Sequence, residues 1–268
     1  MEVSAQLVKE LREKTGVSMM ECKKALVASN GNFEDAVKYL REKGISLVAK
    51  KADREANEGR VFTYISSDMK KGVILEISCE TDFVAKSDDF INFGTKLAEM
   101  LSNSNFAGME AVLSLVLDGK SVQNIISDLV LKLGENINIK RVEKVEAQGI
   151  VSNYVHSNGK IGVLVDFETE IDVVLAKDIA MHIAAMNPLY LKPEQVPAEE
   201  INKEKEIIKA QAINEGKPAN VADKIVEGRL NKFFQEVCLL EQEFVKEKAT
   251  VKSILKNHSI KGFFRYSF

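Results

Sequence analysis

An internal repeat in the middle of the chain constrains the fold more than any other feature. Residues 59–77 (GRVFTYISSDMKKGVILEI) align without a gap on residues 149–167 (GIVSNYVHSNGKIGVLVDF), and seven of the nineteen positions are identical. Each copy has two runs rich in β-branched residues around a polar turn, which is typical of a β-hairpin. A helical pattern follows each hairpin, at residues 90–100 and at residues 177–186. The repeat therefore predicts two similar α+β subdomains built on antiparallel hairpins.

The two copies differ between hairpin and helix. LAEM at residues 97–100 corresponds to IAAM at residues 183–186, an offset of 86 residues, whereas the hairpins are offset by 90. The first copy therefore carries four extra residues, which fall within residues 80–87 (ETDFVAKS), here named the TDF loop. Because the second copy folds without this insertion, the loop is a candidate for function. The alternative is that Phe83 folds back onto the core.

Three short helical patterns precede the repeat. Each begins after a residue that favours the N-cap position: Ser4, Ser18 and Asn32. We expect Gly44 to end the third helix. Three short helices within residues 1–45 resemble the ubiquitin-associated type of domain, a small interaction module with a hydrophobic surface near its first loop. Met19 and Met20 lie beside that loop, where they either form an adaptable contact surface or fill the bundle core.

The C-terminal part contains two amphipathic stretches, at residues 199–214 and 220–239, on either side of Gly216-Lys217-Pro218. This pattern predicts an antiparallel, coiled-coil helical hairpin inserted into the second subdomain, with apolar stripes that pack between its helices. The predicted organisation is a head (residues 1–45), a charged linker (46–58), a first core subdomain (59–146), a second core subdomain (147–198 and 240–268) and the helical hairpin (199–239).

Charge and motif content argue against several function classes. The chain has 37 Lys+Arg against 40 Asp+Glu, a net charge of -3, which does not favour direct nucleic-acid binding. It contains no phosphate-binding GxxxxGK[ST] loop and no GxSxG or HExxH motif, so we expect no covalent enzyme chemistry. His182 lies in an apolar helical run and is expected to be a packing residue. We expect neither a cofactor nor a metal.

The cysteines and the apolar segments point to a cytoplasmic protein. Cys22, Cys79 and Cys238 are far apart and odd in number, which fits neither a disulfide framework nor a zinc site. The first residues carry acids where a signal peptide has a basic and then an apolar segment. No apolar run approaches the length of a membrane span, so we expect no membrane association.

Four motifs, in order, resemble elongation factor Ts, the family of bacterial guanine-nucleotide exchange factors for elongation factor Tu. They are LREKTGVSMMECKKAL near the start, TDFVAK in the TDF loop, LGENINIKR at residues 133–141 and GKPANVADKIVEGRLNKF at residues 216–233. The resemblance runs from the first helix to Phe268. It implies that Phe83 contacts a partner, against the alternative of a core residue.

The resemblance also implies a mechanism. In that family the aspartate and phenylalanine of the TDF motif insert beside the nucleotide site of the partner, and they loosen its Mg²⁺ and phosphate contacts. These residues are Asp82 and Phe83 here, with Thr81 and Val84 beside them in the predicted contact. The expected partner is elongation factor Tu, both GDP-bound and nucleotide-free. A homodimer or a heterotetramer with the partner both stay open.

Further contact positions follow from the resemblance: Lys23, Leu133, Gly134 and His156. Met19 and Met20 join them as contact candidates because of their place beside the first loop of the head. Lys23 is equally explained as an exposed helix residue, and Gly134 as a helix C-cap. The first copy has Ser66 at the position of His156, so the fold does not require the imidazole there.

One departure and one alternative function complete the predictions. Family members commonly continue past the final strand into a C-terminal helix that contacts the partner, whereas this chain stops after residues 260–268; we expect either a natural end with a weaker contact or a truncation. The alternative function is a non-catalytic adaptor that binds a protein through its ubiquitin-associated-type head.

Overall fold

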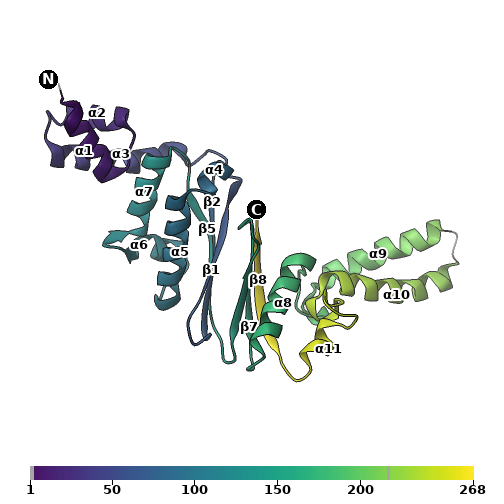
Figure 1. The fold of residues 1–268 in the computed structure, drawn as a ribbon. Coiled ribbons are helices and arrows are strands. Elements are labelled where there is room, and N and C mark those ends of the chain that lie inside the picture. Colours follow the sequence, from purple (N-terminus) through teal and green to yellow (C-terminus); the bar gives the residue numbers. More distant parts are fainter. Residues whose placement is uncertain (1–2, 216–217) are drawn as a thin grey trace.

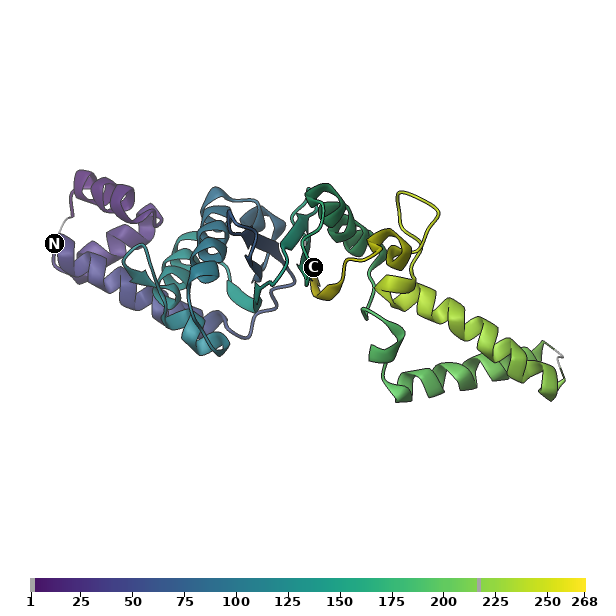
Figure 2. The same ribbon diagram turned by 90° about the horizontal axis from the view of Figure 1, so that it is seen from below.

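The computed structural model describes residues 3–215 and 218–268. The molecule is elongated, with three N-terminal helices at one end, two small sheets in the middle and a pair of long helices at the other end (Figures 1 and 2). Helices combine with small antiparallel sheets, which confirms the prediction of an α+β fold.

The head consists of α1 (Ala5–Thr15), α2 (Met19–Ala28) and α3 (Phe33–Lys51). The predicted N-caps are confirmed, because the side chains of Ser4, Ser18 and Asn32 each accept hydrogen bonds from backbone N–H groups in the first turn. A separate core includes the fully buried Leu11 and Leu26. The head therefore has its own hydrophobic interior.

The predicted end of the third helix at Gly44 is wrong, since α3 continues to Lys51. Gly44 is buried against α7 (Val122–Leu133), where a Cβ would lie 2.8 Å from the carbonyl oxygen of Ser127. The glycine lets two helix backbones approach closely and does not act as a helix terminator. Part of the predicted linker is consequently the last turn of α3, which attaches the head to the first subdomain.

The two repeats form two three-stranded sheets with the orders β1-β2-β5 and β6-β7-β8. The first comprises β1 (Glu58–Ile65), β2 (Lys71–Cys79) and β5 (Asn138–Glu146). The second comprises β6 (Val151–Val155), β7 (Ile161–Phe167) and β8 (Ile260–Ser267). Val61 pairs with Glu76 in one hairpin and Val151 with Asp166 in the other, so the repeats share one register. Both sheets also have an irregularity directly after that acidic residue.

The two sheets contact each other reciprocally. The N–H of Val61 donates to the carbonyl of Gly159 at 2.8 Å, and the N–H of Val151 donates to the carbonyl of Met69, the residue equivalent to Gly159, at 2.7 Å. A Cβ on Gly72 would overlap Val151, and a Cβ on Gly162 would overlap Val61. This exchange of equivalent contacts gives the core a pseudo-twofold arrangement, with an apolar layer between the sheets.

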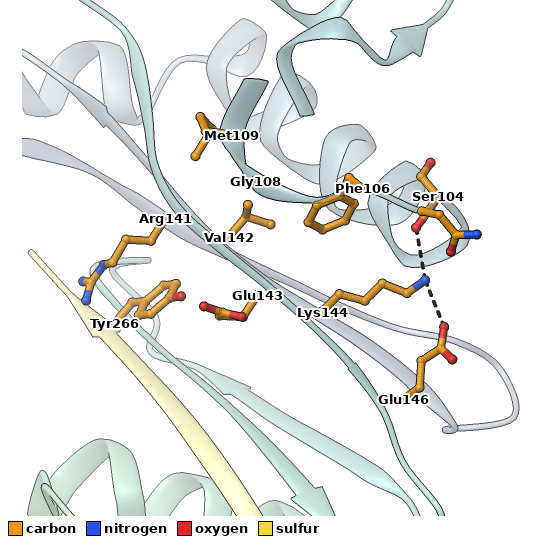
Figure 3. A pocket seen from close by; sticks show the side chains of 11 residues that line it. Ser104, Phe106, Gly108, Met109, Arg141, Val142, Glu143, Lys144, Glu146 and Tyr266 are labelled. Atoms are coloured by element: carbon orange, nitrogen blue, oxygen red, sulfur yellow. Dashed lines mark hydrogen bonds and ion pairs between the residues drawn. The ribbon is translucent and has the colours of Figure 1, made fainter. Parts of the chain in front are cut away.

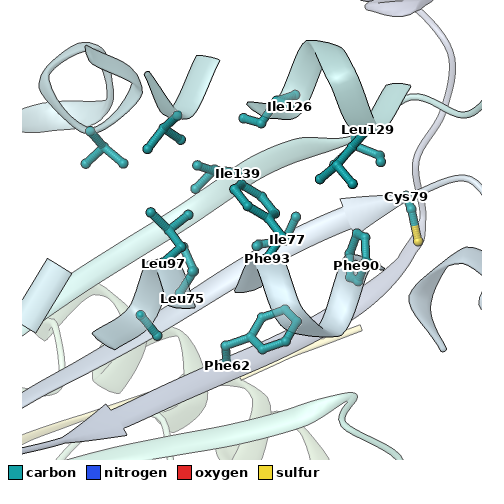
Figure 4. Packing of buried hydrophobic residues seen from close by; sticks show 14 of the residues in the cluster. Phe62, Leu75, Ile77, Cys79, Phe90, Phe93, Leu97, Ile126, Leu129 and Ile139 are labelled. Atoms are coloured by element: carbon teal, nitrogen blue, oxygen red, sulfur yellow. The ribbon is translucent and has the colours of Figure 1, made fainter. Parts of the chain in front are cut away.

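Equivalent helices cover the outer faces of the sheets. In the first subdomain α5 (Asp88–Asn103) packs on β1 and β2, and α7 lies beside it over a core that contains Phe90 and Leu97 (Figure 4). In the second, α8 (Val173–Met186) packs on β6 and β7. The remaining short elements are α6 (Gly108–Ser114), β3 (Val116–Leu117), β4 (Lys120–Ser121), η1 (Pro193–Gln195), η2 (Leu239–Glu241) and α11 (Val251–Leu255).

The paired helices are α9 (Ala198–Asn214) and α10 (Ala219–Val237), which lie side by side and project from the second subdomain (Figure 2). Ile208 and Ala212 are buried, as the prediction of interhelical packing requires. Gly216 and Lys217 of the predicted break lie outside the described residues. None of the helices in the described ranges is both long and apolar enough to span a bilayer.

Candidate functional site

The TDF loop contains a short helix, α4 (Asp82–Ala85), directly after β2. Thr81 is its N-cap in extended conformation, and its hydroxyl oxygen accepts a hydrogen bond from the N–H of Val84. Residues 168–172, which connect β7 to α8, are fewer and form no helix. The extra residues of the first copy thus build a helical turn that the second copy does not have at the equivalent point.

Glu135, in the segment after α7, holds the start of the TDF loop. Its carboxylate accepts hydrogen bonds from the N–H groups of Glu80 at 3.1 Å and Thr81 at 3.0 Å, and from the Thr81 hydroxyl at 2.5 Å. In return, the Glu80 carboxylate accepts from the N–H of Asn136 at 2.7 Å. Charge-assisted bonds of this kind are among the stronger ones in proteins, so the start of the loop is held firmly against the segment after α7.

These positioning residues were not predicted as site residues. Glu80, Glu135 and Asn136 do fall within the TDF loop or the LGENINIKR segment, so the motifs contain them. Their pairing joins segments more than fifty positions apart, and only the fold brings them together.

Phe83 does not belong to the core. Its side chain is 82% exposed, whereas Val84 and Ala85, on the inner face of the same helix, are buried in the core of the first subdomain. The alternative that Phe83 folds back onto the core is therefore wrong. Leaving a phenylalanine in water forgoes about 2 kcal/mol of burial free energy. The aromatic ring is therefore presented by a short helix that is anchored by its buried face and by the residues that precede it.

Asp82 faces solvent beside Phe83. Its carboxylate forms an ion pair with Lys86 at 2.6 Å, and the hydrogen bond from Lys86 holds the pKa of Asp82 below its usual value, with a smaller contribution from Lys160. The aspartate is therefore ionised near neutral pH and offers an anionic acceptor. Lys160 belongs to the turn between β6 and β7, so the second hairpin contributes charge near the TDF loop.

His156 lies in that same turn. It is exposed, and its Nδ1 lies 3.1 Å from the hydroxyl of Tyr154. The turn is attached to the first sheet, because Lys160 pairs with Glu58 at 2.7 Å and Gly159 accepts from Val61. The fold thus brings His156 and the TDF loop, which are distant in sequence, to one end of the paired sheets.

Leu133 and Gly134 form the C-terminal end of α7. Gly134 has φ +80° as the helix C-cap, which confirms the C-cap explanation, and its surroundings leave room for a side chain. The carbonyl of Gly134 accepts a hydrogen bond from Lys51 at the end of α3. Because Glu135 follows directly, this helix end adjoins the TDF loop.

The predicted contact residues of the head are all exposed. Met19 is 42% and Met20 is 64% exposed, so the alternative that they fill the bundle core is wrong. Lys23 lies one helical turn after Met20 on α2, and Val27 follows after a further turn at 48% exposed. These residues form an apolar strip with one lysine on the outside of the head.

Other side chains that could carry out chemistry, Cys79, Cys238 and His182, are buried in the fold. Burial raises the pKa of Cys79 to about 12 and that of Cys238 to about 11, so neither thiol is ionised at neutral pH. His182 is fully buried, with its Nε2 3.0 Å from Oε1 of Gln242, which confirms that it is a packing residue. Within the described part of the chain, no group of three His, Cys, Asp or Glu side chains is placed to hold a metal.

A cavity of about 760 Å³ lies along β5 and is lined by residues of β5, by the segment between α5 and α6 and by Tyr266 of β8 (Figure 3). Its cationic side chains already have partners. Lys144 pairs with Glu146 at 3.0 Å and donates to the carbonyl of Ser104, and Arg141 binds Glu76 on β2. The lining therefore resembles a paired charged surface more than a catalytic centre.

Comparison with known proteins adds independent information. A family model described as Elongation factor TS matches residues 80–268, a range that begins at the TDF loop. Elongation factor Ts from Clostridium perfringens (strain 13) is 49% identical over 251 residues, which cover 91% of this chain and 83% of that protein. The protein of that name from Halothermothrix orenii is 48% identical over 99% of this chain and 92% of its own length. The one from Nautilia profundicola is 49% identical over 94% and 86%.

Proposed function

The chain belongs to the elongation factor Ts family and is a translation elongation factor, and from that premise we propose that it promotes the release of GDP from elongation factor Tu through the TDF loop. The single observation that carries the proposal is an exposed Phe83 on an anchored helical turn that the duplicated subdomain lacks. No covalent chemistry is required, because exchange is achieved by binding alone.

Phe83 acts in this proposal as a wedge that displaces structure beside the nucleotide site. A wedge must keep its position when it meets the partner. Val84 and Ala85 anchor it from below, and Glu135 fixes the preceding residues. A preorganised side chain loses little conformational entropy on binding, so its burial free energy can be used to displace the partner's elements.

Asp82 supplies the charged part of the contact. Its ion pair with Lys86 joins two exposed side chains, and such pairs contribute little to stability. The carboxylate can therefore exchange Lys86 for a hydrogen-bond donor of the partner at small cost. In a dehydrated interface an anionic acceptor binds more strongly than a neutral one.

A small displacement is sufficient for release. A nucleoside diphosphate is held largely by contacts of its phosphates and Mg²⁺, which depend steeply on geometry. By linkage, a factor that weakens GDP binding is itself weakened by GDP to the same extent. The complex of all three components is therefore a strained intermediate.

The other predicted contacts belong to the same proposal. Leu133 and Gly134 adjoin the TDF loop through Glu135, and His156 lies at the end of the sheets where the charge of Lys160 reaches Asp82. Met19, Met20 and Lys23 would add a separate grip from the head. A contact through the head, distant from Phe83, provides binding free energy that does not depend on the nucleotide.

The test is the release of a fluorescent GDP analogue from preloaded elongation factor Tu. Added at substoichiometric amounts, the chain is expected to accelerate release with turnover, because an exchange factor is recycled. Stable binding to elongation factor Tu with an unchanged rate of GDP release would contradict the proposal. It would favour the alternative function of a non-catalytic adaptor that binds through its head.

A further inference from the structure

A second cavity lies where β8 begins beside α11. The start of β8 and α4 of the TDF loop lie at opposite ends of the paired sheets (Figure 1). It measures about 340 Å³ and is built by four parts of the chain: the residue after β7, the segment after α8, the η2 and α11 region, and the start of β8 with the residues before it. Its lining residues are Glu168, Leu191, Lys192, Gln195, Leu240, Lys252, Leu255, Lys256, His258, Ser259, Ile260 and Lys261.

The cavity is strongly cationic although the whole chain carries a net charge of -3. Its lining includes four lysines and one carboxylate, Glu168. Lys261 is paired with Asp166 at 3.6 Å. Lys192, Lys252 and Lys256 form neither an ion pair nor a side-chain hydrogen bond within the residues that the structure describes. Three unpaired lysines therefore line one concave surface.

The surroundings of these lysines strengthen their effect on an anion. The buried side chains of Leu191, Leu255 and Ile260 contribute an apolar floor. A low-dielectric wall focuses the field of the charges that surround it, so the cavity attracts anions more than isolated surface lysines do. Its volume falls at the lower end of the range for small-molecule sites, roughly 300–1,000 Å³.

The lining selects a class of anion. It contains lysines and no arginine, and lysine binds phosphate oxygens as a compact point charge. It also contains no Phe, Tyr or Trp on which a nucleobase would stack. A single phosphate carries roughly -1.5 to -2 at neutral pH, which leaves part of the charge of three lysines unmatched.

We propose that this cavity is a binding site for a small ligand with two linked phosphate groups. Inorganic pyrophosphate and the diphosphate of a nucleotide share this chemistry. The site is separate from the proposed exchange loop, and it stands or falls independently of the exchange activity.

Isothermal titration calorimetry of the full chain, at low salt and without Mg²⁺, tests the proposal with pyrophosphate, GDP and orthophosphate. Pyrophosphate is expected to bind saturably with one site per chain. GDP should bind with similar affinity, because the cavity offers the base no stacking partner. Orthophosphate should bind about tenfold more weakly, since it lacks the second phosphate.

A pair of matched variants locates the site. Lys192→Gln/Lys252→Gln removes two cavity lysines from different segments and leaves Lys256, which has φ +53°, unchanged. We expect it to lower pyrophosphate affinity about tenfold or more. Lys203→Gln/Lys205→Gln on exposed positions of α9 makes the same charge change and should have no effect. Circular dichroism establishes that both variants are folded.

Three results would overturn the proposal. The first is the absence of saturable pyrophosphate binding to the wild-type chain. The second is an equal loss of affinity in the α9 control, which would indicate a general charge effect. The third is orthophosphate binding as tightly as pyrophosphate, which would refute the requirement for linked phosphates. Each can occur while exchange activity remains normal.

Discussion

The two copies of the repeat have the same hairpin register, the same irregularity in the central strand and reciprocal hydrogen bonds, yet only the first carries the TDF loop. Val61 and Val151 make equivalent contacts to the other copy, whereas Phe83 has no equivalent between β7 and α8. What the copies share is explained by packing. What distinguishes the first copy is an exposed aromatic residue that packing does not require, and this difference separates scaffold from function.

The shared part of the comparison predicts the largest loss of stability. Gly72→Ala and Gly162→Ala each introduce a Cβ that overlaps a valine of the other copy, Val151 and Val61 respectively. We expect each to destabilise by ~1–3 kcal/mol, because overpacking displaces neighbours. Denaturant unfolding of both variants measures the effect.

A double-mutant cycle shows whether this loss arises at the contact between the copies. Val61→Ala removes the methyl groups that a Cβ on Gly162 would meet, so Gly162→Ala should cost much less in that background. Additive losses would argue against reciprocal packing as the cause.

The TDF loop, which only the first copy has, predicts an effect of intermediate size on the rate of GDP release. Glu135→Gln weakens the acceptor for three hydrogen bonds from Glu80 and Thr81, which should loosen the TDF loop. We expect GDP release to slow about tenfold, or roughly 1.4 kcal/mol, with little loss of global stability. Glu143→Gln, on the exposed face of β5, removes the same charge and serves as the control. Equal rates for the two variants would contradict the role of Glu135.

The smallest expected effect is a pH-dependent change in stability, and it comes from a difference between the equivalent helices α5 and α8. His182 on α8 is buried by Gln242 and Phe244, whereas the aligned residue on α5, Lys96, is exposed. Burial lowers the pKa of His182 from its ordinary 6.5. As the pH decreases below 6.5, the unfolded chain binds a proton at this histidine before the folded chain does. The free energy of unfolding therefore decreases until the pH has passed below the pKa of His182 in the folded chain.

A neutral replacement isolates this contribution. When the pH is lowered from about 7.5 to about 5.5, the melting temperature of His182→Gln should decrease less than that of the wild-type chain, because a glutamine at this position gains no proton on unfolding. An identical decrease in both proteins would show that His182 does not contribute to the pH dependence.

The sequence predicted the elements that depend on local patterns. The N-caps Ser4, Ser18 and Asn32, both hairpins and the exceptional loop were readable from residue types and from the repeat. The prediction that Gly44 ends a helix is wrong because a glycine is also required where two helices pack closely, and the sequence does not show that α7 lies against this position. The clamp by Glu135 and the anchoring of Val84 depend on contacts between distant segments, which no local pattern encodes.

The central claim is that Phe83 acts as a wedge, and GDP release from elongation factor Tu in the presence of Phe83→Ala tests it most directly. Val174→Ala is the matched control, because Val174 is an exposed apolar residue, 68% exposed, at the start of the helix in the second copy. The account predicts a folded Phe83→Ala variant with release near the spontaneous rate, and a control with the wild-type rate. Wild-type release with Phe83→Ala would contradict the account.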